Sequence, residues 1–251
     1  VGRSDARHNA VVEVSDDGRV SGFAYKPDRP AGTTVATEIF LYDPGVLLGL
    51  LARLRAELSH ADDEGSSGLG DFGEHLLPAL VDRGRTYAAP MGGYWRDVGR
   101  PEVYLQAHRD LLRGKVDVFD RPGMPVLTRW PEKPPARVRP SGAVDDALLG
   151  AGVVVHGTVR RSVLGPGVVV EKGAVVEDCV IGADVVIASG ATVRTSIVDD
   201  GCRIGRGARV GRTPASTRLR EQDIAILGRD TTVAASSEVG AGARLEPGSS
   251  A

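Results

Sequence analysis

Aromatic residues are scarce in this sequence, where Phe, Trp and Tyr together make up 4% of 251 residues. A core built on large rings is therefore excluded, and the apolar residues available are Val, Ala, Leu and Ile. The chain has two cysteines, Cys179 and Cys202, without the spacing of metal ligands. We interpret both as small buried side chains in a reducing compartment rather than as a disulfide.

Long apolar runs and an excess of one charge are also missing. Without an eighteen-residue apolar run or a signal peptide, we expect a cytoplasmic chain that does not associate with a membrane. The formal net charge of −2 gives no basic field over the whole chain, so nucleic acid is not an expected partner. The sequence begins with Val1 rather than Met, which we interpret as a sign that a segment precedes it.

The sequence does have a seventeen-residue unit written three times over 163–213. A helix face needs apolar steps of three and four, whereas a step near six predicts a triangular coil of short strands, each pointing an aliphatic residue at the axis. Stacked coils of this kind pair their strands in parallel. The pattern is typical of a left-handed parallel β-helix of hexapeptide repeats, which we assign to 146–251, with its first coil from Leu148. The aliphatic positions step by six, six and five: 164, 170, 176, 181, 187, 193, 198, 204 and 210.

Residues 1–115 alternate predicted strands and helices, as in an α/β sheet. The predicted strand segments are a hairpin over 10–26 that turns at Asp16-Asp17-Gly18, a strand over 33–43, and a strand entering a loop over 85–99. The predicted helices are 45–58, 72–83 with Asp71 as its cap, and Pro101 to about Leu112, with a polar loop over 59–70.

This α/β part is shorter than a complete nucleotide-binding sheet. A doubly wound sheet opens with a strand, a Gly-rich turn and a helix whose N-terminus holds phosphate, and 1–115 contains no such sequence. Residues 116–145 are rich in Pro and Arg and predict an ordered linker. The expected fold class is thus α/β plus all-β, with a partial Rossmann-like domain over 1–115 and the β-helix after the linker.

The most promising chemical motif is Tyr-Trp-Arg-Asp-Val-Gly over 94–99, placed where a strand is expected to end. Open α/β sheets present their ligands at such ends. Asp97 could hold a divalent cation, and Arg96 could orient it or bind an anion. A surface loop with an Arg–Asp pair is an equally good interpretation of these residues taken alone.

The order of several motifs resembles the glucose-1-phosphate adenylyltransferases (ADP-glucose pyrophosphorylases) over essentially the whole chain. The segment GDFGEHLLPALVDRG followed by the YWRDVG loop is the most specific part, and the phrase DIAILGRD follows a charged insertion as in that family. The resemblance covers the later portion of the family's nucleotidyltransferase domain and its C-terminal hexapeptide coil.

The resemblance implies a reaction in which ATP and glucose 1-phosphate give ADP-glucose and pyrophosphate, in glycogen or α-glucan synthesis. It implies magnesium held by two aspartates, of which Asp97 is one and the other precedes residue 1. Lys26 matches the lysine that binds the sugar phosphate, and Tyr94 and Trp95 match residues that wall the sugar pocket. In-line phosphoryl chemistry of this kind depends on positioning and charge neutralisation.

Three residues depart from the family pattern on the sugar side. Tyr25 stands where the motif has a glutamate, and Ala36 and Glu38 stand where it has a serine and a glycine. The specificity for glucose is therefore not implied as firmly as the reaction. Because the family's phosphate-binding GGxGxRLxPLT loop has no counterpart in this chain, we expect the chain to be inactive alone.

Alternative functions remain open at this point. One is a mannose-1-phosphate guanylyltransferase-like enzyme, and another is a non-catalytic oligomerisation or regulatory module. A coil-type acyltransferase using His156 is a further class, although a solvent-facing corner histidine is the simpler interpretation. The β-helix is expected to form a homo-oligomer, and Arg218 and Arg220 in the charged insertion are candidate ligands for an anionic allosteric effector.

Overall fold

The computed structural model describes residues 1–58, 69–116, 118, 123, 126–128, 131–216 and 218–251. The chain divides into two compact units, Val1–Trp95 and Arg96–Ala251. The loop predicted over 59–70 and the linker predicted over 116–145 lie partly outside the described residues.

The first unit is organised around an antiparallel hairpin, as the alternation over 10–26 predicted. Strand β1 (Ala10–Val14) pairs with β2 (Val20–Tyr25) after the short helix α1 (Arg3–Ala6). Gly18 in the turn has φ of 82°, a backbone conformation that glycine adopts without a steric penalty.

Two helices complete the first unit by burying leucines against each other. The predicted helix after Pro44 is confirmed as α2 (Pro44–Leu58), whose Leu50 and Leu54 contact Leu76 of α3 (Leu76–Asp82). Helix α3 begins four residues later than predicted. The expectation that Asp71 caps it is wrong, because the Asp71 carbonyl and carboxylate accept N–H groups of a preceding turn over 72–75 instead.

The two other strands predicted from sequence, over 33–43 and 85–99, are not formed, so these predictions are wrong. Residues 33–43, all of them described, form no strand, and their pairing with β1 is limited to the isolated bridge between Val35 and Val11. Glu38 then turns the chain with φ of 58°, and Leu41 is fully exposed, so the apolar pattern finds no strand to pair with in the described residues. Residues 85–99 likewise pair only where Tyr87 forms a bridge with Arg19.

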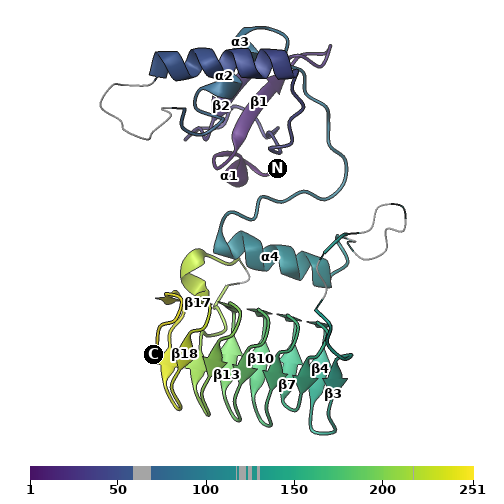
Figure 1. Ribbon diagram of the computed structural model, residues 1–251, viewed down its shortest axis with the longest axis vertical. Coiled ribbons are helices and arrows are strands. Elements are labelled where there is room, and N and C mark those ends of the chain that lie inside the picture. Colours follow the sequence, from purple (N-terminus) through teal and green to yellow (C-terminus); the bar gives the residue numbers. More distant parts are fainter. Residues whose placement is uncertain (59–68, 117, 119–122, 124–125, 129–130, 217) are drawn as a thin grey trace. The chain divides into compact units, whose positions relative to one another are not determined.

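The second unit is a parallel β-helix with helix α4 (Pro101–Leu112) packed on it, and α4 has the predicted bounds. Figure 1 shows the strands of successive coils lying side by side. They form three six-stranded sheets. The first sheet is β4 (Ala143–Asp145), β7 (Thr158–Arg160), β10 (Val175–Glu177), β13 (Thr192–Arg194), β16 (Arg209–Val210) and β19 (Glu238–Val239). The second is β5 (Leu148–Leu149), β8 (Val163–Leu164), β11 (Val180–Ile181), β14 (Ser196–Val198), β17 (Ala225–Leu227) and β20 (Arg244–Leu245). The third is β3 (Arg137–Val138), β6 (Val154–Val155), β9 (Val169–Val170), β12 (Val186–Ile187), β15 (Arg203–Ile204) and β18 (Thr232–Val233).

The register of the coils is the one that the sequence repeat predicted. Val176 pairs with Val193 and Ile187 with Ile204, and all four side chains are buried at the axis. Each coil therefore covers the apolar residues of its neighbour, which is how a solenoid builds one continuous core from short strands. Cys179 and Cys202 are buried free thiols, in agreement with their interpretation from sequence.

The division of the chain differs from the expected one in two respects. The β-helix starts at Arg137 rather than near 146, because Val138 and Val144 already pair in register with Val155 and Val159. Helix α4, expected to close the α/β part, belongs to the second unit. Its Leu105 is buried against the outside of the coil, which explains the difference. Among the helices described here, none is long and apolar enough to cross a membrane.

Candidate functional site

The loop that follows Trp95 is held on helix α4 by a buried carboxylate. Asp110 of α4 is 1% exposed, and its Oδ2 accepts a hydrogen bond from Arg96 Nη2 at 2.6 Å. Its Oδ1 accepts from Gln106 Nε2 at 3.0 Å and lies 3.1 Å from Lys115 Nζ. We call these four residues, Arg96, Gln106, Asp110 and Lys115, the Asp110 clamp.

Asp97 follows the clamped arginine directly and is exposed. Its Oδ1 accepts the backbone N–H of Gly99 at 3.0 Å, which folds 97–99 into a tight turn ahead of α4. This bond leaves Oδ2 of the same carboxylate available to a ligand. Among the residues described, no group of three or more His, Cys, Asp or Glu could hold a metal ion.

Asp97 fits magnesium as one ligand of a shared site. Mg²⁺ is usually bound through one or two carboxylates together with waters and substrate phosphates, rather than in a cage made only of protein ligands. A single exposed carboxylate with a spare oxygen meets that description. The role assigned to Asp97 from sequence stays a prediction that this geometry permits.

Lys26, the predicted phosphate ligand, is engaged by its neighbours in the first unit. Its Nζ donates to the Tyr25 hydroxyl at 2.6 Å and lies 3.8 Å from Asp71 Oδ2. The Tyr25 hydroxyl in turn donates to Asp71. The hydrogen bond to Tyr25 raises the pKa of Lys26, and the bond donated by Tyr25 lowers the pKa of Asp71, so both groups are charged at neutral pH.

The ring of Tyr25 is seated on the backbone of Gly73. A Cβ added to Gly73 would lie 2.0 Å from Tyr25 Cδ2, so a larger residue would displace the ring. Tyr25 thus occupies the place of a carboxylate in the family motif and links Lys26 to the turn before α3. The sequence signal for this arrangement was the departure at Tyr25, but the partnership with Asp71 was not foreseen.

The other two departures lie on the segment beside the hairpin. Ala36 donates its N–H to the Ala10 carbonyl at 2.8 Å. Glu38 has φ of 58°, in the left-handed region that favours glycine. Its carboxylate acts electrostatically on Lys26, raising the pKa of that amine further. Three groups on this side, Tyr25, Asp71 and Glu38, therefore compete with a phosphate for the lysine.

Tyr94 and Trp95 end the first unit, and both are half-buried. They directly precede the clamped loop in sequence, but they belong to the first unit, whereas the loop belongs to the second. Their predicted role in walling a sugar pocket stays a prediction.

The candidate effector ligands lie in the charged insertion before β17. Arg220 bonds to Asp223 through its backbone N–H at 3.0 Å and its Nε at 3.4 Å, across the short 3₁₀ helix η1 (Glu221–Asp223). Arg218 donates its backbone N–H to Ser216 at 3.1 Å, and its side chain is exposed. A cavity of about 290 Å³ nearby is lined by Arg109, Arg113 and Arg161, and by neither of the two predicted residues.

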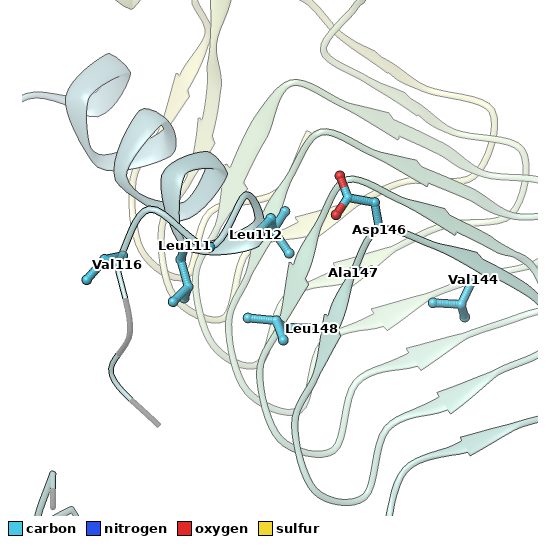
Figure 2. Close-up of a pocket in the computed structure, with 8 residues that line it drawn as sticks. Leu111, Leu112, Val116, Val144, Asp146, Ala147 and Leu148 are labelled. Carbon is cyan, nitrogen blue, oxygen red and sulfur yellow. The ribbon is translucent and has the colours of Figure 1, made fainter. Parts of the chain in front are cut away.

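A second cavity is chemically plain and belongs to neither site. Figure 2 shows it between the end of α4 and the first coil. Its volume is about 730 Å³. Aliphatic side chains such as Leu111, Leu112 and Leu148 line it together with the Asp146 carboxylate. The residues predicted from sequence to bind substrate or metal are not part of its lining.

The fold and the loop together define a class, that of nucleotidyltransferases joined to a hexapeptide coil. A family model described as nucleotidyl transferase matches residues 1–114, and one described as GlmU-like, C-terminal hexapeptide matches residues 134–224. These matches confirm the expected fold class of an α/β nucleotidyltransferase segment followed by a β-helix.

Within that class, the chain is similar to glucose-1-phosphate adenylyltransferases, and the resemblance inferred from its motifs is confirmed. It is 26% identical to the enzyme of Acetivibrio thermocellus over 251 residues, covering 97% of this chain and 57% of the relative. It is 33% identical to that of Streptomyces coelicolor, covering 70% and 48%, and 32% identical to that of Geobacillus stearothermophilus, covering 69% and 43%. The chain thus spans about half the length of the curated relatives it matches.

Proposed function

We propose that this chain serves the synthesis of ADP-glucose and pyrophosphate from ATP and glucose 1-phosphate, within glycogen or α-glucan synthesis. The observation that carries the proposal is the exposed Asp97 carboxylate, presented on a clamped loop in a chain similar to adenylyltransferases throughout. The sugar-phosphate oxygen attacks the α-phosphorus of ATP, forming the new phosphoanhydride bond as the bond to the pyrophosphate leaving group breaks.

The residues of this chain act on the sugar side of that reaction. Asp97 is the ligand for magnesium, which when bound neutralises charge on the phosphates. Lys26 attracts the sugar phosphate as a point charge, and Tyr94 and Trp95 wall the sugar. Arg96, which the sequence offered as a substrate ligand, is directed to Asp110 and so acts on the loop rather than on the substrate.

Catalysis needs donors around the triphosphate that residues 1–251 do not supply, since they contain no Gly-rich phosphate loop. We expect no pyrophosphate release from the chain alone with ATP, Mg²⁺ and glucose 1-phosphate. Adding the segment of the Streptomyces coelicolor relative that this chain does not span should restore release, and Asp97→Asn should abolish it again. An Asp97→Asn protein as active as the parent in that mixture would refute the assignment.

The surroundings of Lys26 favour one alternative, a module that assembles or regulates a nucleotidyltransferase without binding the sugar phosphate itself. Tyr25 and Asp71 already hold the Lys26 amine. If the site is used, Asp71→Asn should strengthen binding of glucose 1-phosphate and Lys26→Ala should weaken it, both measurable by calorimetry. Identical, negligible heats for both variants and the parent would favour the non-catalytic module.

Which sugar phosphate and which nucleotide base are accepted can be tested separately from the type of reaction. Tyr25→Glu restores the family residue at this position, and a gain in glucose 1-phosphate turnover over mannose 1-phosphate would support the glucose-specific assignment. A preference of the parent for mannose 1-phosphate with GTP would instead select the guanylyltransferase-like alternative.

We also propose that the chain self-associates, binds an anionic effector and resides in a reducing compartment. Val138 and Val144 occupy core positions of the first coil yet remain 50% and 36% exposed, which supports self-association through the β-helix. The exposed guanidinium of Arg218, beside the ion-paired Arg220, is offered to an anionic effector. The unpaired thiols of Cys179 and Cys202 support a reducing compartment such as the cytoplasm.

A further inference from the structure

Asp110 is the most deeply buried carboxylate of the described residues, and the proposed reaction gives it no role. An ionised carboxylate in the interior is strongly disfavoured unless it is paired and hydrogen-bonded. Here one oxygen receives Arg96, and the other receives Gln106 and Lys115. The partners come from the loop before α4, from α4 itself and from the residues just after it, so one carboxylate joins three consecutive segments.

Helix α4, which carries Asp110, is itself fixed to the β-helix. Leu105 is buried against Val180 and Ile224 on the outer side of the coil. The next residue before Asp110, Arg109, forms a two-pronged ion pair with Asp178, with Nε 2.8 Å from Oδ1 and Nη2 bonded to Oδ2. Two-pronged arginine–carboxylate pairs restrict geometry as well as adding energy. The helix is therefore held against sliding and against rotation.

These contacts form one continuous connection from the coil to the exposed carboxylate of Asp97. It runs from Asp178 on the coil to Arg109, through the helix to Asp110, and from there to Arg96, the residue before Asp97. The Arg96 contact thus adds a tertiary attachment to those that the loop has through the chain at Pro101 and through the turn that Gly99 makes with Asp97.

We propose that Asp110 is a positioning residue, which fixes the loop carrying Asp97 to α4 and through Arg109 to the β-helix. The coil then has a part in catalysis besides any role in assembly, because it sets where the metal ligand lies. This inference rests on the proposed function for the use of Asp97, but the fixing of the loop does not depend on which substrate is bound.

A spin label tests the fixing of the loop directly, without any activity. Val98 lies two residues beyond Arg96 and is 49% exposed, whereas both native thiols are buried, so V98C can be labelled selectively. In the parent the nitroxide spectrum should show restricted motion. Asp110→Asn and Arg96→Gln should both narrow the lines, and Arg96→Lys, which keeps one charged donor, should restore part of the restriction.

A second readout concerns the metal in the active mixture with the segment of the Streptomyces coelicolor relative. Loss of a group that orients a metal ligand typically costs about 10–100-fold in metal affinity. We expect the Mg²⁺ concentration for half-maximal rate to rise about tenfold in Asp110→Asn and Arg96→Gln, with KM for ATP unchanged at saturating Mg²⁺. Glu238→Gln, which breaks an equally charged but exposed pair with Arg209, is the matched control and should change neither readout.

The outcomes separate this inference from the proposed function. Unchanged label motion and unchanged Mg²⁺ requirement in Arg96→Gln would overturn the positioning role, even if ADP-glucose is formed. Loosened labels in variants that form no ADP-glucose with the added segment of the Streptomyces coelicolor relative, where the parent chain forms none either, would support the clamp and refute the function. If Asp110→Asn does not fold, Arg96→Gln decides, because it leaves Asp110 bonded to Gln106 and Lys115.

Discussion

The close stacking of the coils makes a sharp prediction at Gly205. A Cβ placed there would lie 2.6 Å from Ala235 N, 2.7 Å from the Ala234 carbonyl carbon and 2.7 Å from Val233 O. All three are backbone atoms of the next coil, which cannot rotate away as a flexible side chain can. The N–H of Gly205 also donates to Val233 O at 2.8 Å, so separating the coils stretches a bond between them.

The cost of Gly205→Ala follows from this geometry. Ordinary van der Waals contact begins near 3.4 Å, so two backbones must move apart by several tenths of an ångström. Overpacking of a well-packed interior costs about 1–3 kcal/mol. Because the displaced atoms are backbone and take a hydrogen bond with them, we expect a loss near the upper end, about 3 kcal/mol.

Gly190→Ala is the matched control in the same β-helix. Gly190 has φ of 73°, and a Cβ there meets nothing within 4 Å, so the substitution carries backbone strain without a clash. That strain is about 1–2 kcal/mol for a residue with a side chain in the left-handed region. The free energy of opening of the coil should be measured by amide hydrogen exchange, which reports on this unit separately from the other. Equal losses in the two variants would refute the steric argument.

Three further predictions test other parts of the molecule. Leu105→Ala should cost about 2–5 kcal/mol and release α4 from the coil, seen as loss of amide protection in α4 alone. Burial raises the pKa of the Cys179 thiol from near 9 to about 12, so it should resist alkylation at pH 8 until the coil unfolds. The free energy of unfolding contributed by this neutral thiol is fully present below pH 9 and is lost as pH rises toward 12, because the thiol of the unfolded chain ionises first. Denaturant midpoints measured across that pH range check the sign. Gly49→Ala in the middle of α2, where nothing lies within 4 Å, should stabilise the first unit by about 0.5–1 kcal/mol in thermal melts.

The β-helix could be predicted from sequence because its core is local and periodic. Each inward residue, such as Val176 or Ile187, sees the equivalent residue seventeen positions away, so the repeat itself encodes the pairing. The first coil was placed too late because the Pro- and Arg-rich composition of 116–145 indicated a linker, although Arg137–Val138 and Ala143–Asp145 pair with the coil that follows. Pairing with the next coil, rather than composition, makes them strands.

The α/β part was harder to predict because strands depend on neighbours that a local pattern does not contain. The residues around Ile39 have the β-branched character of a strand, yet Ile39 is 73% exposed and pairing ends at Val35. The site shows the same limit. Asp97 stood out through its motif, whereas Asp110 looks like an ordinary polar residue of a helix until the fold brings Arg96 and Lys115 to it.

Different residues should control the stability of the coil and the order of the loop that carries Asp97. The reason is that α4 links this loop to the coil. Asp178→Asn breaks the ion pair that ties Arg109 to the coil, where both side chains are mostly buried. Removing one partner of such a pair costs about 3–5 kcal/mol when fully buried and less here, where some solvent reaches both. It should therefore loosen a label at Val98, whereas Gly205→Ala should weaken the coil and leave that label restricted. If the two variants loosened the label equally, the loop would be ordered by the stability of the whole unit and not by this connection.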